Sequence, residues 1–377
     1  MNITTRNEYM NALEALGVCV SARIPALLWG NPGEGKTAAV ESCTTTGWHV
    51  ETVIITHSEP SDFAGLPVIT ADGSVNLAPP GWAKRLADHD GPSIAFFDEF
   101  STAAPSLQAA ALRPLTHYEV GSLQLPPTVS FVAAANPSDV AAAGWELAAP
   151  TASRFVHLDW GMPLEVYSEG LVTGQWPTMP VYPRPEDYDH YLAEENVLVA
   201  GFLQVRSSQL SAIPDNAAER GHAFPTPRTW DYAARLSAFA RAVGASDEVR
   251  RLLITGCIGS GTAHEYLRWV AAQELVDPEE LLASPSTADF TDMRADRVFV
   301  CLQSVLAAFS RKPTEDRWAA AIDICAAAAG QVGVDPAVPI VRSLMRPGIR
   351  PDGAPIPSSI KVFAPALMLA GLIPSTP

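Results

Sequence analysis

A glycine-rich segment with a basic and a hydroxyl side chain at its end has the clearest chemistry in the sequence. It consists of Gly30, Asn31, Pro32, Gly33, Glu34, Gly35, Lys36 and Thr37. Glycines let the backbone curl and bring its N–H groups close to phosphate oxygens. Lys36 supplies a charge for the β and γ phosphates, and the Thr37 hydroxyl is a ligand for Mg²⁺. The spacing G-x₄-G-K-T therefore predicts a loop that binds ATP with Mg²⁺.

Two adjacent acids end an apolar run further along the chain, Phe96-Phe97-Asp98-Glu99. Adjacent acids by themselves are usually surface residues. Here they follow a phosphate loop and lie at the end of an expected strand, which favours a Walker B element. Asp98 is expected to hold Mg²⁺ through water, and Glu99 to polarise the attacking water as general base.

A third polar group follows another apolar run, 133–135, which ends at Asn136 and Pro137. An amide at this position can reach between the two earlier elements and orient the water. The alternative is an asparagine that serves only the turn before the proline. We expect Asn136 to take part in catalysis.

Three arginines are candidates for contacts with phosphate. Arg154, in Ser153-Arg154-Phe155, is expected to act as an arginine finger across a subunit boundary. Arg228, at the start of a helix, is expected to lean over the nucleotide from a lid. Arg113 is open between a role at the subunit boundary and a plain salt bridge.

These residues need a parallel sheet to bring them together. The sequence predicts buried strands over 26–29, 53–55, 93–97, 129–134 and 155–158, with helices between them, which is typical of an α/β fold with helices on both faces. A hairpin is expected over 67–77, where Asp72-Gly73 suits a type I′ turn. Helices are expected over 6–19, 82–89 and 106–115.

The chain changes character after residue 160. Residues 162–185 are rich in proline and are expected to be irregular. Beyond them only helices are expected, over 186–205, 228–243, 247–258, 263–274, 298–309 and 314–329. The predicted domains are an α/β nucleotide-binding core (1–160) with an insert at 62–82, a linker (161–185), a helical lid (186–245) and a helical C-terminal extension (246–377).

Composition narrows the classes of function. The chain of 377 residues has 41 acidic and 25 basic residues, for a net charge of −16, whereas a general nucleic-acid binder needs a basic face. Protein partners are therefore favoured. Five cysteines without paired spacing, no secretory signal and no apolar run of bilayer length predict a reduced, cytoplasmic protein without membrane insertion.

The motifs taken together resemble the AAA+ ATPases, and most of all their MoxR branch, with the related CbbQ/NorQ and magnesium-chelatase ATPase subunits. The resemblance covers roughly residues 20–245. It rests on GNPGEGKT, the stretch 94–115 with one extra alanine, AAANP, TASRF and PTPRTW.

That resemblance implies a hexameric ring with ATP between neighbours, and places the hairpin toward the ring pore or a partner. It also implies a chaperone-like role, in which the ring remodels or activates a protein client together with a von Willebrand factor A-domain partner. Two features depart from the family pattern. Pro114 is expected to end or kink its helix, and the helical region after residue 245 is longer than a lid.

Two other functions use the same residues. An ATP-gated scaffold would bind ATP with little turnover, which the long helical extension makes reasonable. A nucleic-acid motor would use identical chemistry, but the insert has no cluster of lysine or arginine. The client, the pathway and the symmetry of the ring are beyond what the sequence determines.

Overall fold

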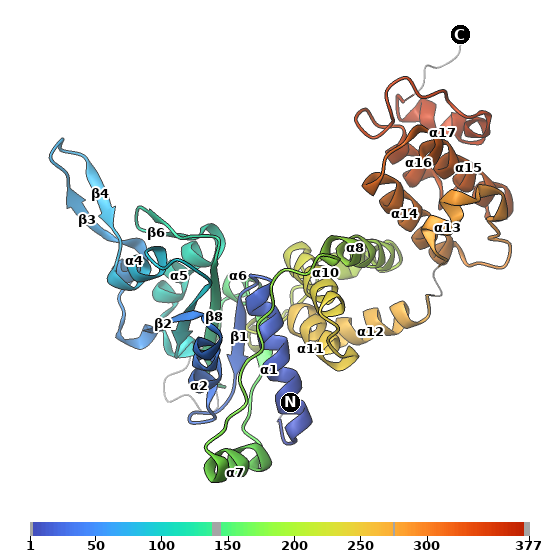
Figure 1. The fold of residues 1–377 in the computed structure, drawn as a ribbon. Coiled ribbons are helices and arrows are strands. Elements are labelled where there is room, and N and C mark those ends of the chain that lie inside the picture. Colours follow the sequence, from blue (N-terminus) through green and yellow to red (C-terminus); the bar gives the residue numbers. More distant parts are fainter. Residues whose placement is uncertain (1–2, 138–144, 274–275, 373–377) are drawn as a thin grey trace. The chain divides into compact units, whose positions relative to one another are not determined.

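A five-stranded parallel sheet lies at the centre of the first of two structural units (Figure 1). This computed structural model describes residues 3–137, 145–273 and 276–372. The first unit comprises Met1–Leu192 and Gln209–Glu265, and the second comprises Ala193–Ser208 and Tyr266–Pro377. Each unit is described by itself below.

The sheet has the order β2-β5-β8-β1-β9. Its strands are β1 (Ala26–Trp29), β2 (His49–Ile54), β5 (Ser93–Asp98), β8 (Val129–Ala135) and β9 (Val156–Asp159). Near-continuous apolar runs suit strands that are covered on both faces. Leu28 pairs with Ala134 on one side and with Leu158 on the other, so the strands align their carboxyl ends. The predicted α/β class is confirmed, although β2 begins four residues earlier than expected.

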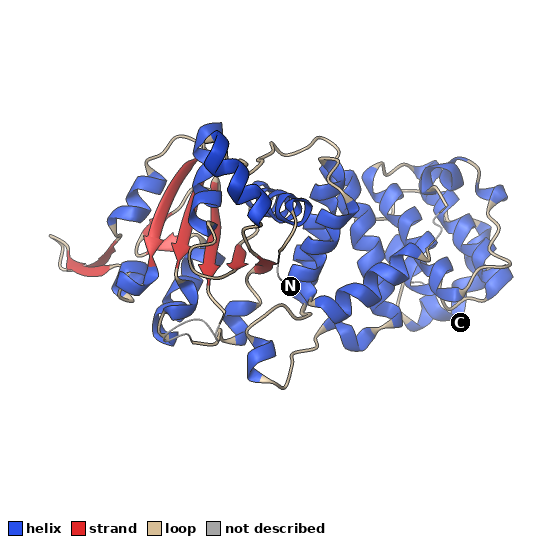
Figure 2. Cartoon of the chain, turned by 90° about the horizontal axis from the view of Figure 1, so that it is seen from below, coloured by secondary structure: helices blue, strands red, loops and turns tan. Residues whose placement is uncertain are grey.

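Helices cover both faces of this sheet (Figure 2). On one face, α1 packs against β1, β8 and β9. On the other face, Phe97 and Phe131 belong to a core that includes Phe63 and Trp82. The helices that begin in this unit are α1 (Arg6–Ser21), α2 (Lys36–Glu41), α3 (Ser61–Ala64), α4 (Gly81–Ala87), α5 (Pro105–His117), α6 (Ala149–Ala152), α7 (Leu164–Thr173), α8 (Tyr188–Val205), α9 (Ala217–Arg220), α10 (Pro227–Ala242), α11 (Asp247–Ile258) and α12 (Ser260–Ala271).

The expected hairpin is present, but its turn is of another type. Strands β3 (Leu66–Ile69) and β4 (Val75–Ala78) pair antiparallel. A type I′ turn needs positive φ at both central residues, and of the two only Gly73 has it, at +81°. The Asp72 carboxylate instead accepts hydrogen bonds from Thr70 Oγ1 and from the Ser74 N–H and hydroxyl. These bonds, with Thr70 the largest cause, lower the pKa of Asp72 to about 2.

Two further expectations about local structure concern segments with proline. Pro114 was expected to end or kink its helix, and it does not end it, because α5 continues to His117 and Tyr118 N–H still bonds to Pro114 O at 3.0 Å. The proline is buried, and it removes a single N–H donor from the helix. The segment 162–185, expected to be irregular, contains α7, which starts after Pro163 and ends at Gly174 with φ of +69°.

The described part of the second unit is helical. Its helices are α13 (Pro278–Ala283), α14 (Ala295–Arg311), α15 (Glu315–Val332), α16 (Val338–Leu344) and α17 (Ala364–Leu369), in addition to the C-terminal parts of α8 and α12. They pack around the fully buried Trp318, whose indole N–H donates to Leu344 O at 2.9 Å. This matches the helices expected over 298–309 and 314–329, whereas α13, α16 and α17 were not anticipated.

The expected division near residue 245 falls between α10 and α11, which pack against each other within the first unit. Helix α12 ends at Ala271, and residue 274 of the helix expected there lies outside the described residues. In the part of the chain that is described, no helix combines the length and the apolar character needed to cross a bilayer.

Candidate functional site

The phosphate loop connects β1 to α2, as the sequence predicts. Two of its glycines, Gly33 and Gly35, have φ of +81° and +73°, a region that a side chain would strain. At Gly30 an added Cβ would lie 2.7 Å from Trp160 O, so only glycine fits there. The glycines therefore serve both the curl of the loop and its close packing against the chain that follows β9.

Lys36 lies inside this loop with 8% of its surface exposed. Its Nζ donates to Gly30 O at 2.6 Å, Asn31 O at 2.9 Å and Asn136 Oδ1 at 2.9 Å. All three acceptors are neutral oxygens. Burial lowers the pKa of Lys36, and the charges of Asp98 and Glu34 partly oppose this shift. An ammonium group held by neutral acceptors is well suited to receive an anion such as a phosphate.

The Glu34 carboxylate already occupies a position where the loop can bind an anion. It accepts hydrogen bonds from Asn31 N–H at 2.8 Å and from Asn31 Nδ2 at 3.0 Å. A carboxylate at these donors shows that the loop offers hydrogen bonds to negative charge.

The side chains of Thr37 and Asp98 contact each other at the carboxyl end of the sheet. The Thr37 hydroxyl donates to Asp98 Oδ2 at 2.9 Å, and Glu99 N–H donates to Asp98 Oδ1 at 2.8 Å. A hydroxyl and a carboxylate side by side are the hard oxygen ligands that Mg²⁺ prefers. The donor set therefore fits the magnesium site expected from the sequence.

Glu99 follows β5 with φ of +59°, in the left-handed region. Its Oε2 accepts a hydrogen bond from Thr56 Oγ1 at 2.5 Å, and Thr56 lies just beyond the end of the neighbouring strand β2. A left-handed conformation in a non-glycine residue is uncommon and is often found at functional sites. No local pattern in the sequence indicates Thr56, because the contact joins residues 43 positions apart.

Asn136 lies between the two motifs at the end of β8. Its side chain accepts from Lys36, and its backbone is fixed by Ser101, whose hydroxyl accepts from Asn136 N–H at 3.0 Å and donates to Asn136 O at 3.1 Å. Ser101 comes from the short helical turn after Glu99. The structure thus brings Lys36, Asp98, Glu99 and Asn136 to the carboxyl ends of β1, β5 and β8.

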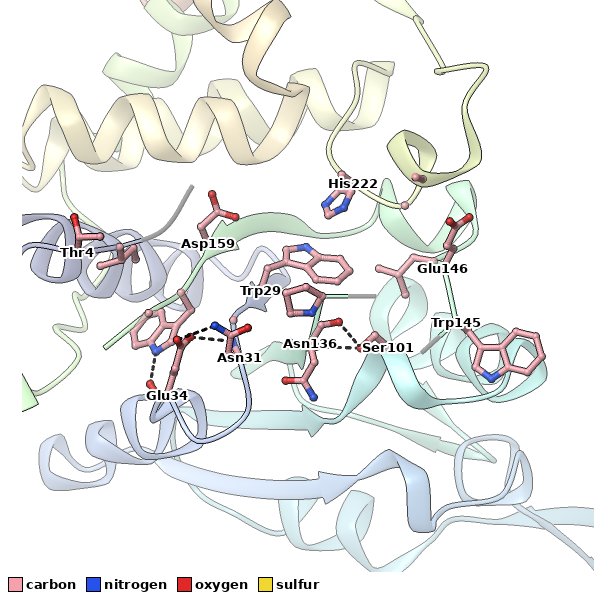
Figure 3. Close-up of a pocket in the computed structure, with 18 residues that line it drawn as sticks. Thr4, Trp29, Asn31, Glu34, Ser101, Asn136, Trp145, Glu146, Asp159 and His222 are labelled. Carbon is pink, nitrogen blue, oxygen red and sulfur yellow. Dashed lines mark hydrogen bonds between the residues drawn. The ribbon is translucent and has the colours of Figure 1, made fainter. Parts of the chain in front are cut away.

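A cavity of about 420 Å³ opens beside this loop (Figure 3). Its size lies within the roughly 300–1,000 Å³ typical of ligand sites. Its wall includes Asn31, Glu34 and Asn136, together with aromatic side chains and one histidine, His222. The His222 ring lies 4.7 Å from the Trp29 ring, and burial lowers its pKa. His222 comes from the segment between α9 and α10, so that segment borders the cavity.

Arg154 and Arg228 lie in a different place. Both line a second cavity, of about 550 Å³, to which Arg23 and Arg235 also contribute. No aspartate or glutamate is among its described lining residues. Arg228 donates to Ser153 Oγ at 3.3 Å, and Arg154 donates to Thr116 Oγ1 at 2.8 Å. Burial, and then the charge of Arg228, lower the pKa of Arg154. Arg228 was expected to lean over the nucleotide from a lid, and the structure places it in the second cavity with Arg154.

The two cavities lie at opposite ends of the same strands. Trp29, Asn136 and Asp159, at or just beyond the carboxyl ends of their strands, line the first cavity. Pro25 and Arg154, which precede β1 and β9, line the second. At about 3.3 Å per residue, the strands between them span roughly 13 Å for β1 to 23 Å for β8.

Arg113, left open by the sequence, pairs with Glu119. Its Nε and a terminal nitrogen donate to Glu119 Oε2 at 3.0 and 2.7 Å. Both side chains are largely exposed, so the pair contributes little to stability.

Comparisons with known proteins give a distant likeness. No protein-family model matches the chain, and no curated protein matches its sequence. Among solved structures, the chain is similar to a crystal structure described as "a putative ATPase" from Cytophaga hutchinsonii, with 15% identity over 70% of this chain and 92% of that chain and a TM-score of 0.42. It is also similar to a full-length MCM homologue from Methanopyrus kandleri, with 18% identity over 66% of this chain and 55% of that chain and a TM-score of 0.37. Neither likeness bears on chemistry, which is argued below from the residues themselves.

Proposed function

We propose that this protein is an ATP-hydrolysing AAA+ motor of the MoxR type, whose active sites form between neighbouring copies. The observation that carries the proposal is the separation of the two half-sites. The phosphate loop and its acids lie at one end of the sheet, and the arginine-lined cavity lies at the other. An arginine side chain is too short to span the strands between them.

The separation has a direct consequence for assembly. If Arg154 acts on a γ phosphate, that phosphate must be bound by another copy. The contact is then heterologous, the amino end of one sheet facing the carboxyl end of the next, and such contacts close into rings when the rotation permits. A hexamer is the ring that we propose, on the family resemblance.

The chain's own residues divide the work as follows. Lys36 and the loop N–H groups bind the phosphates, while Thr37 and Asp98 are placed to hold Mg²⁺. The metal would neutralise charge on the β and γ phosphates. Glu99 takes a proton from the attacking water, and Asn136 orients that water. Arg154 of the neighbouring copy then stabilises the charge that develops on the transferred phosphoryl group.

Arg228 is assigned to the same step as Arg154. Its place in the second cavity supports a role on the neighbour's nucleotide rather than on that of its own chain. In the same chain, the segment between α9 and α10 borders the first cavity through His222, and Arg228 is not among the described residues that line that cavity.

The proposed output is remodelling or activation of a protein client, in the cytoplasm, with a von Willebrand factor A-domain partner. The β3–β4 hairpin projects from the first unit (Figure 1). Its apolar side chains Leu66, Ile69 and Val75 are 60–77% exposed, which suits contact with a partner. The net charge of −16 supports a protein client over nucleic acid.

The test is ATP turnover by the purified protein under conditions that favour assembly, with Glu99→Gln as the control. Turnover that the variant lacks supports the motor. Equal rates for both proteins, with tight ATP binding retained, would leave the ATP-gated scaffold as the better description.

A further inference from the structure

Helix α7 presents an apolar stripe to solvent. Leu164, Tyr167, Leu171 and Val172 lie within about 140° of one another around the helix axis at 100° per residue. They are 47–86% exposed, and Leu164 and Val172 are the most exposed of the four, at 78% and 86%. Contiguous exposed apolar patches are uncommon on soluble proteins and often mark interaction sites. Helix α7 stands apart from the sheet, between the short connection 160–163 that follows β9 and the longer segment 174–187 that leads to α8 (Figure 1).

Contacts on the opposite face of α7 hold the helix in place. Val166 is buried, and Trp176 packs so closely on Gly170 that an added Cβ would lie 2.5 Å from the indole. Glu169 forms an ion pair with Arg6 of α1. These contacts anchor the helix, and within the stripe Tyr167 also lies against Trp176, with ring centroids 6.0 Å apart.

Both connections of α7 are tied to the phosphate loop and its helix. Before α7, the Trp160 indole N–H donates to Glu34 O at 3.1 Å, and Met162 packs against Gly35. After α7, the fully buried Met179 donates its N–H to Ser42 Oγ at 2.9 Å, just beyond α2. A contact made by the stripe would thus be transmitted to the phosphate loop through these two connections.

The position of α7 in the chain indicates what covers it. The helix follows β9 and Trp160, so it emerges at the carboxyl end of the sheet, the end that carries the phosphate loop. Under the proposed function, a neighbouring copy approaches this end with its arginine-lined cavity. The charged residues of α7 are Glu165 and Glu169, both acidic; Glu169 is paired with Arg6, and the exposed Glu165, beside the stripe, complements those arginines. The same acids disfavour a lipid surface, where lysine and arginine are expected.

We propose that the stripe formed by Leu164, Tyr167, Leu171 and Val172 is the docking surface for the neighbouring copy of this chain that supplies Arg154. This inference rests on the proposed function, because it needs an assembly in which the two ends of the sheet meet. It adds a specific element to that assembly and a physical link from the subunit contact to the phosphate loop.

The test is the mass of the assembly with ATP and Mg²⁺, measured by light scattering over a range of protein concentrations. The background is Glu99→Gln, which keeps ATP intact. The double variant Leu164→Asp with Leu171→Asp places charges in the stripe, and we expect it to need at least about tenfold more protein to assemble, since a buried unpaired charge weakens an interface by more than one decade. Leu369→Asp is the matched control, the same change at a leucine that is 92% exposed in the second unit. It should assemble like its parent.

Each outcome has a distinct meaning. If the parent protein assembles and the double variant assembles at the same concentration, the docking surface is overturned while the proposed motor stands, because something other than a second copy covers the stripe. If the parent does not assemble with ATP, the proposed function itself fails. Hydrogen exchange tests the inference without a variant that could misfold. Amides of α7 in the parent protein should exchange more slowly after assembly, and unchanged exchange would also overturn the inference.

Discussion

The separation of the two half-sites predicts that two inactive variants will restore each other's activity. Lys36→Ala removes the ammonium group that meets phosphate but leaves Arg154 intact. Arg154→Ala leaves the phosphate loop intact but removes the proposed finger. Each variant alone should lose turnover, the second by on the order of 10³-fold or more, as in other phosphoryl-transfer sites that lose a finger.

The recovered activity follows from the geometry. In an equal mixture, a working site needs an intact loop from one copy and an intact arginine from the next, each with a chance of one half. About one quarter of the sites should therefore be complete in any closed ring of heterologous contacts, whatever its size. The assay is steady-state phosphate release at fixed total protein, with the mixing ratio varied and each variant measured alone.

One result would contradict the assignment of Arg154 to the neighbouring copy. If Arg154 acted within its own chain, the mixture would be no more active than the sum of the separate variants at every ratio. That result would contradict the assignment drawn from the opposite ends of β1, β8 and β9. Co-purification of differently tagged variants shows that subunits exchange, because mixtures of the wild type with either variant follow simple dilution whether or not mixed assemblies form.

Three other predictions concern single residues. Arg228→Ala should lower turnover of the assembly but leave the ATP affinity of the isolated protomer within about twofold, because Arg228 lines the second cavity and not the one beside the phosphate loop of the same chain. Equilibrium binding of a fluorescent ATP analogue checks this. A large loss of affinity would instead indicate that Arg228 contacts the nucleotide bound by its own chain. Thr56→Val should raise basal turnover by about tenfold or more, since a hydrogen bond to a charged group is worth about 1.5–3 kcal/mol and its loss frees Glu99 for water. Thr56→Ser is the matched control, and a slower Thr56→Val enzyme would refute the proposal that Thr56 holds Glu99. The five cysteines are all buried, and burial raises the pKa of Cys43 to about 12 and of Cys301 to about 11. Because the thiolate is the reactive form, the native protein near pH 8 should be inert to a thiol reagent that labels all five cysteines after denaturation. Rapid labelling of the native protein would contradict their burial.

Much of the fold could be predicted from the sequence, because its signals are local. The strand 26–29 was predicted at its observed bounds, and the apolar runs before Asp98 and Asn136 were assigned correctly. Each is a short buried apolar run, followed by a glycine loop in the first case and by a polar residue in the other two, and this pattern is local in the sequence. The turn at Asp72 was mistaken for the opposite reason: two backbone conformations suit the same Asp-Gly pair, and the hydroxyls of Thr70 and Ser74 decide between them.

Helix α7 shows a second kind of limit. Its segment has several prolines nearby and an apolar face that points outward, so neither its periodicity nor its composition separates it from a linker. The helix is stabilised by contacts with residues distant in sequence, such as Arg6 with Glu169. Likewise, α5 continues past the buried Pro114, which local sequence rules do not predict.

The sequence by itself determined the candidates for chemistry: the residues whose side-chain types suit phosphate, magnesium and a reacting water. Those roles follow from side-chain type and from strand ends, and parallel strands bring their carboxyl ends together in any such sheet. Only the tertiary structure decided which end of the sheet each group occupies. It placed Arg228 with Arg154 and Thr56 against Glu99, because these contacts join segments 43 to 75 positions apart, whose meeting depends on how the whole unit packs.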